Sequence, residues 1–104
     1  MEKESAKAPS KRLRPAKRGK SFEPVVARAF GAVVREQRLR KEIAQDQFAL
    51  LADVDRSYFG KLERGERQPS LAIMLRIAGA LGISAASIVK SVEAALRSKR
   101  KADS

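Results

Sequence analysis

The chain contains no cysteine and no histidine among its 104 residues. Without cysteine it can form neither a disulfide nor a thiolate nucleophile. Without histidine it lacks the commonest general base, and the two absences together remove the usual zinc ligands and any Ser/His or Cys/His catalytic pair. Phosphate-binding loops of the GxxxxGKS/T or GxGxxG type are missing too, as are carboxylates clustered at metal spacing. We therefore expect neither an enzyme nor a bound cofactor or metal ion.

Long apolar runs are also missing. No stretch approaches the roughly 18 apolar residues of a membrane-spanning helix, and the basic N-terminus lacks the apolar segment of a secretory signal. A length of 104 residues with 43% hydrophobic residues fits one small domain with its own core. We expect a single-domain cytoplasmic protein.

Positive charge is what the chain has in excess. Residues 1–20 carry eight basic and two acidic side chains, and residues 97–104 carry four basic and one acidic. Residues 21–96 are nearly balanced, with eleven basic and nine acidic side chains. Two basic arms thus flank a nearly neutral domain, and their simplest partner is a polyanion. The alternative is that both arms are solvated tails that aid solubility. A membrane anchor fits less well, because the first arm has almost no apolar face.

The N-terminal residues show no hydrophobic periodicity and mix basic side chains with proline, serine and alanine. Such a segment buries too little apolar area to offset chain entropy, so we predict a disordered basic arm over 1–22. The ordered domain is predicted over 23–96, and 97–104 are interpreted as a basic C-terminal tail.

Within the domain, apolar residues recur at helical rather than alternating spacing, which predicts an all-α bundle without strands. Asp55 is a candidate N-cap, Gly65 and Gly82 are candidate helix stops, and Ser84 is placed to open the last helix. The five expected helices cover about 24–41, 45–52, 56–63, 71–81 and 84–96.

The second and third expected helices are short and are joined by a turn at Asp53 and Val54. Two such helices cross steeply, so one can lie in a major groove of DNA while the other packs across it. Asp53 falls where the turn needs a left-handed backbone, which aspartate tolerates better than most residues but less well than glycine. The pattern predicts a helix-turn-helix over 45–63.

Five sequence segments in this region resemble the Xre, or Cro/phage-repressor, family of helix-turn-helix proteins. They are QDQFA at 45–49, VDRSYF at 54–59, LERG at 62–65, QPSL at 68–71 and IAGALGIS at 77–84. Each is weak alone, but the ordered series spans about 30–89. The resemblance implies a five-helix bundle of the lambda-repressor type. It further implies a small transcription regulator that binds double-stranded DNA, associated with the bacterial nucleoid.

The resemblance also assigns roles to particular side chains. Arg56 and Lys61 are expected to read base edges, where Arg or Lys can donate to guanine O6 and N7. Gln45 and Ser57 are expected to contact either a base or a phosphate. The residues expected at the DNA backbone are Tyr58, Arg64, Arg67 and Gln68. Arg38 and Glu63 are expected to form a partly buried structural ion pair. The plain alternative for Arg56 and Lys61 is that both are solvated residues on an exposed helix.

Three residues depart from the family pattern. Ala44 stands where serine or threonine would cap the second helix. Asp53 replaces the usual turn glycine. Gly60 lies inside the recognition helix, where it costs about 1 kcal/mol relative to alanine; we interpret it as a tolerated defect, with close approach to DNA as the alternative.

One recognition helix covers only a few base pairs, so useful specificity usually requires two. In this class the protein two-fold matches a palindromic operator with half-sites about 34 Å apart. The apolar residues after the fourth helix exceed what a small domain needs, so we expect a homodimer through 83–96. They are Ile83, Ile88, Val89, Val92 and Leu96. The alternative is that they close the monomer core.

The leading interpretation is a sequence-specific regulator, in particular a repressor or autoregulator. Alternatives are an antitoxin-like protein that binds a toxin and its own promoter, a non-specific architectural DNA-binding protein, and a protein-interaction adaptor. The basic residues of the recognition helix argue against the adaptor.

Overall fold

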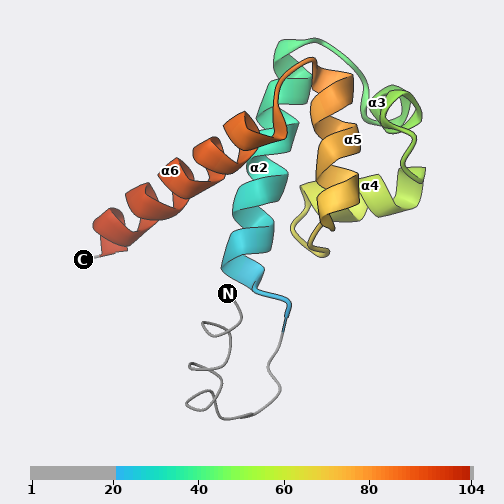
Figure 1. Cartoon of the computed structure of the whole chain (residues 1–104). Coiled ribbons are helices and arrows are strands. Elements are labelled where there is room, and N and C mark those ends of the chain that lie inside the picture. Colours follow the sequence, from blue (N-terminus) through green and yellow to red (C-terminus); the bar gives the residue numbers. More distant parts are fainter. Residues whose placement is uncertain (1–20, 104) are drawn as a thin grey trace, which may run out of the picture.

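The computed structural model describes the backbone of residues 21–103 and the side chains of 21–99. Almost all of the arm predicted over 1–22 lies outside these residues. Within them the chain forms five helices and no strand (Figure 1). The helices are α2 (Pro24–Arg40), α3 (Gln45–Ala52), α4 (Arg56–Glu63), α5 (Leu71–Leu81) and α6 (Ala85–Asp103). The all-α prediction is confirmed.

Local sequence signals explain where these helices begin and end. Pro24 occupies the first turn of α2, where its missing N–H removes no hydrogen bond. Asp55 caps α4 by accepting from the Tyr58 amide at 2.9 Å, and Ser70 caps α5 by accepting from the Ile73 amide at 3.2 Å. α3 begins without a side-chain cap, because Ala44 makes no capping bond.

The core lies where α3, α4 and α5 meet α2 and α6. Phe48 of α3 and Phe59 of α4 pack against each other with ring centroids 5.2 Å apart, which joins the two helices of the helix-turn-helix through their buried faces. The largest fully buried side chains are Phe48, Phe59, Leu62, Ile77, Leu81, Ile88 and Val34. The opposite faces of α3 and α4 are thereby left toward solvent.

Gly31 sets the distance between α2 and α4. A Cβ atom built on Gly31 would lie 2.4 Å from the Leu62 carbonyl oxygen and 2.5 Å from that of Glu63. Only glycine permits this approach, because backbone atoms cannot rotate out of the way. No motif or spacing in the sequence indicates this role for Gly31.

The last helix is longer than expected. α6 continues past Leu96 to Asp103, so residues 97–103, interpreted from sequence as a tail, extend the same helix. No glycine or proline interrupts it, and alanine, lysine and arginine are strong helix formers. α6 packs beside α2, and its C-terminal end points away from the other helices (Figure 1).

None of the helices in the described part of the chain is by itself long and apolar enough to span a membrane. Only α5 taken together with Ala85–Lys99 passes a test of length and composition, and these two segments meet at a 103° bend.

Candidate nucleic-acid interface

The turn between α3 and α4 has the backbone conformation that the sequence analysis predicts. Asp53 adopts φ 59° and ψ 48°, in the left-handed region. Its carbonyl oxygen accepts a hydrogen bond from Arg76 Nη1 of α5 at 3.2 Å, and Val54 buries its side chain. The turn is therefore fixed from beneath by α5 and the core, which sets the angle at which α4 leaves α3.

α4 has one buried and one exposed face. Phe59, Gly60, Leu62 and Glu63 are buried. Arg56 and Ser57 are exposed, and Tyr58 and Lys61 are half-buried. Of the α4 side chains predicted to meet bases, Arg56 and Ser57 are therefore exposed to solvent and Lys61 is partly exposed.

A buried network holds α4 against α2 and α3. Arg38 forms a two-pronged ion pair with Glu63, with Nε to Oε2 at 2.7 Å and Nη2 to Oε1 at 2.9 Å. The side chains are only 7% and 2% exposed. The remaining donor, Arg38 Nη1, reaches the Ile43 carbonyl oxygen at 2.8 Å. The hydrogen-bonded ion pair with Glu63 raises the pKa of Arg38 above its ordinary value despite burial, so the guanidinium stays charged.

Gln45 belongs to the same network. Its Nε2 donates to Glu63 Oε1 at 2.8 Å, so Glu63 is bonded from α2 and α3 together. The Gln45 oxygen Oε1 lies near Gly60, 3.6 Å from where a Cβ of that residue would be. Gln45 thus bonds to Glu63 through its nitrogen while its oxygen lies beside α4. Among the described residues, every buried polar side-chain atom has a hydrogen-bond partner.

The surroundings of Gly60 could accommodate a side chain. The nearest atoms to an added Cβ are Arg64 Nη1 at 3.2 Å and the Gln45 oxygen at 3.6 Å, both at the ends of flexible side chains. Nothing in the fold itself requires glycine at this position.

Two arginines predicted to contact DNA are bound to carboxylates. Arg56 Nη1 lies 3.3 Å from Asp46 Oδ2. Arg64 donates through Nε to Glu66 Oε2 at 2.8 Å and through Nη2 to Oε1 at 3.3 Å. The bond from Arg64 lowers the pKa of the Glu66 carboxyl below its ordinary value, so Glu66 remains ionised as the pH falls toward that value. Ion pairing of Glu66 is what its position between Arg64 and Arg67 in the sequence indicates, whereas no sequence pattern assigns a role to Asp46.

Gln68, expected at a phosphate, is engaged with the chain before α2. Its Oε1 accepts from the Glu23 amide at 2.7 Å, and its Nε2 donates to the Ser21 carbonyl oxygen at 2.7 Å. These two bonds use the amide oxygen and one of the two N–H groups on Nε2, so the second N–H of Gln68 remains for a phosphate. Its neighbour Arg67 is exposed.

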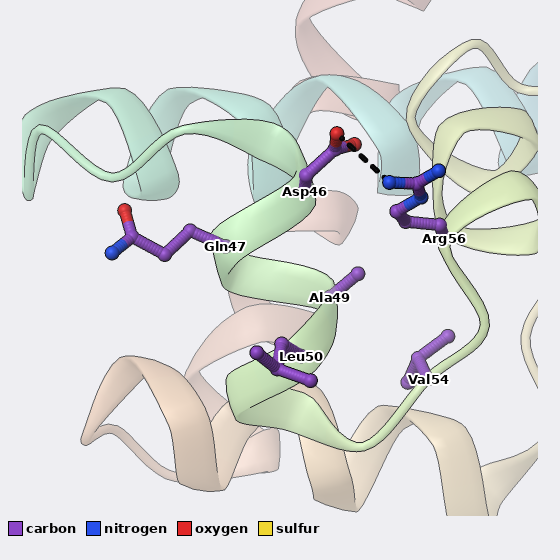
Figure 2. A pocket seen from close by; sticks show the side chains of 6 residues that line it. All are labelled: Asp46, Gln47, Ala49, Leu50, Val54 and Arg56. Carbon is purple, nitrogen blue, oxygen red and sulfur yellow. Dashed lines mark hydrogen bonds and ion pairs between the residues drawn. The ribbon is translucent and has the colours of Figure 1, made fainter.

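A shallow hollow lies between α3 and the start of α4 (Figure 2). The residues that line it are Asp46, Gln47, Ala49, Leu50, Val54 and Arg56. In Figure 2 the Asp46–Arg56 pair bridges the two elements along one side, and Leu50, 80% exposed, lies across the opening from it. The hollow thus borders the first turn of the recognition helix.

The steep pair α3–α4, the left-handed turn and the outward polar face of α4 define a helix-turn-helix DNA-binding protein. The family model described as "Helix-turn-helix" (HTH_3) matches residues 34–88, more than half of the chain. The chain therefore belongs to this helix-turn-helix family, of the Xre/Cro type, and is a sequence-specific DNA-binding transcription regulator. The family expected from the sequence is confirmed.

Individual proteins agree with this assignment. Control protein C.MunI of Mycoplasma sp is 35% identical over 65 residues, which are 62% of this chain and 88% of that protein. The immunity repressor protein of Bacillus phage phi105 is 34% identical over 79 residues, which are 70% of this chain and 55% of the repressor. The crystal structure of the restriction-modification controller protein C.AhdI from Aeromonas hydrophila matches with a TM-score of 0.58 at 40% identity, covering 60% of this chain and 94% of that chain.

Proposed function

We propose that the protein is a repressor or autoregulator that binds a palindromic operator as a homodimer, in the cytoplasm and without enzymatic activity. The observation that carries this proposal is the outward polar face of α4, supported from below by the buried Arg38–Glu63 pair. A rigidly supported helix can place its side chains at fixed positions in a major groove. The names of the relatives, a control protein and an immunity repressor, support a repressing role.

Within this proposal the side chains divide into two groups. Arg56 and Lys61 donate to base edges, and Ser57 and the Gln45 oxygen contact adjoining bases or phosphates. Arg64, Arg67 and the Tyr58 hydroxyl fix the protein on the DNA backbone. Gln68 holds the start of α2 beside Arg67 through its two bonds and donates its second amide N–H to a phosphate.

The structure narrows the surface on which a dimer can form. Of the residues proposed from sequence, Ile88 and Val92 are buried in the chain's own core, as the alternative interpretation expects. Val89 is 42% exposed, and Ile83 and Leu96 are partly buried. We therefore place the two-fold contact at Val89. Leu71 and Leu75 of α5 are also exposed and form a competing apolar surface.

Val89→Glu should convert the dimer to a monomer, because an isologous contact would bring the two new carboxylates together in an apolar patch. Sedimentation equilibrium measures the mass, and Leu50→Glu is the matched control on α3. A monomeric wild-type protein at high concentration, with and without DNA, would contradict the dimer. Loss of the dimer in Leu75→Glu but not in Val89→Glu would move the contact to α5.

Arg56→Ala should relax base preference at one operator position. Loss of a bidentate contact to guanine removes about 1–3 kcal/mol of discrimination, or about 5- to 150-fold in relative affinity. Binding-site selection from random DNA, followed by titration of single-base operator variants, measures this. Arg40→Ala is the matched control, because Arg40 is an exposed arginine on α2 paired with Glu36. An equal loss on operator and random DNA would show that Arg56 contacts phosphate.

Salt dependence tests the architectural alternative. The charge of residues 1–20, eight basic side chains against two acidic ones, favours some sequence-independent binding. A regulator keeps a large operator preference at physiological salt, whereas binding driven by basic arms weakens on all DNA alike.

A further inference from the structure

The ion pair between Asp46 and Arg56 connects the two helices of the helix-turn-helix at the end where α4 begins. Arg56 is the first residue of α4, and Asp46 lies in the first turn of α3. The contact joins Arg56 Nη1 to Asp46 Oδ2 at 3.3 Å (Figure 2). The two side chains are 67% and 70% exposed, so the pair stands at the solvent-facing edge of the interface.

The ion pair with Asp46 leaves one edge of the Arg56 guanidinium, formed by Nε and Nη2, available to a base. An arginine offers five N–H donors in a planar fork, and two adjacent donors make a bidentate contact. Within the described residues, Asp46 bonds to Arg56 through Nη1 alone. The edge formed by Nε and Nη2 can therefore donate to O6 and N7 of a guanine while Nη1 remains on the carboxylate.

Arg64 provides the contrasting case on the same surface. Glu66 takes both Nε and Nη2 of Arg64, at 2.8 and 3.3 Å, and so occupies the edge that Arg56 keeps open. Three N–H groups of Arg64 remain for a phosphate, two on Nη1 and one on Nη2, and such a contact does not depend on the edge that Glu66 occupies. Two arginine–carboxylate pairs of the same charge thus hold their guanidinium groups in different ways.

We propose that Asp46 is a specificity-determining positioning residue, which orients the Arg56 fork toward a guanine and stays bonded to Arg56 in the operator complex. This inference rests on the proposed base contact of Arg56. The bond to Asp46 restricts the rotamers of the long, exposed Arg56 side chain in the free protein. Arg56 therefore loses less conformational entropy when it binds a base. The carboxylate also repels phosphates, which disfavours complexes in which Arg56 turns to the DNA backbone.

The test compares Asp46→Asn with Glu66→Gln in the full chain. Each substitution neutralises a carboxylate that is paired with an exposed arginine. For Asp46→Asn we expect discrimination at the Arg56 base pair to fall about three- to tenfold and affinity for random DNA to rise about two- to fivefold. For Glu66→Gln we expect affinity to rise on all DNA alike, with unchanged base preference. Asp46→Glu should keep part of the discrimination. The measurement is titration of operator, single-base variants and random duplex at fixed salt.

The outcomes separate this inference from the proposed function. If Arg56→Ala relaxes one base pair and Asp46→Asn leaves that base pair fully discriminated, the positioning role of Asp46 is wrong while the regulator stands. If Asp46→Asn and Glu66→Gln raise affinity equally with no change of preference, Asp46 contributes only its charge and the inference is also wrong. If Arg56→Ala changes no base preference, the proposed base contact itself fails. Thermal unfolding checks that each exposed substitution leaves the fold intact.

Discussion

Arg38→Met is expected to lower the free energy of unfolding by about 3–5 kcal/mol, because it leaves the buried carboxylate of Glu63 without its charge partner. The Gln45 amide alone would remain on Glu63, one hydrogen bond in place of three. The Ile43 carbonyl oxygen would lose its guanidinium donor as well. Urea denaturation monitored by circular dichroism measures the change, with a constant slope as the sign that the transition remains two-state.

Two further variants show whether burial or charge is responsible. The double variant Arg38→Met with Glu63→Leu should recover most of the lost stability, since an apolar pair of similar volume requires no desolvation of charge. Arg40→Met breaks the exposed pair with Glu36 on the same helix and should cost less than about 1 kcal/mol. A loss in Arg38→Met no larger than in Arg40→Met would show that the buried pair does not hold α4 in place.

Gly31→Ala is expected to lower the free energy of unfolding by about 2–3 kcal/mol, although alanine is the better helix former by about 1 kcal/mol. The added methyl group would meet the carbonyl oxygens of Leu62 and Glu63 at 2.4 and 2.5 Å, and α2 and α4 would have to separate. Because α4 carries the proposed base contacts, operator affinity should fall with stability.

Gly79→Ala is the matched control for this effect. Gly79 also lies inside a helix, α5, but nothing stands within 4 Å of a Cβ built there. The substitution should therefore stabilise the protein by up to about 1 kcal/mol through helix propensity alone. Thermal and urea unfolding of both variants measure the difference, and equal effects at the two positions would contradict the close contact at Gly31.

Local signals in the sequence were sufficient to predict most of the fold. Caps and stops act within one turn of the chain, so Asp55 and Gly82 mark helix ends in the sequence as they do in the structure. The left-handed turn at Asp53 is likewise a local property. The role of Gly31 could not be predicted in this way, because it depends on α4, about 30 residues further along the chain.

The candidate site shows the same division. The exposed face of α4 follows from helical periodicity, and the family pattern pointed to Arg38 and Glu63 together. Which donor of Arg56 meets Asp46 depends on how α3 and α4 cross, and spacing alone does not contain that angle. Ile88 and Val92 were assigned to a dimer contact but are buried in the chain's own core. Their place also depends on how the helices pack, since an apolar residue on α6 can face either its own core or a partner.

The bonds from Gln68 to Ser21 and Glu23 have a consequence for the basic segment that precedes α2. They tether the chain beside Arg67, in the loop that follows the recognition helix, so the twenty residues before Ser21 start from the side of the molecule proposed to face DNA. At about 3.3 Å per residue, such a length of chain spans at most about 66 Å. We therefore expect its eight basic side chains to lie within reach of the duplex that α4 is proposed to read, up to about two turns of the double helix away.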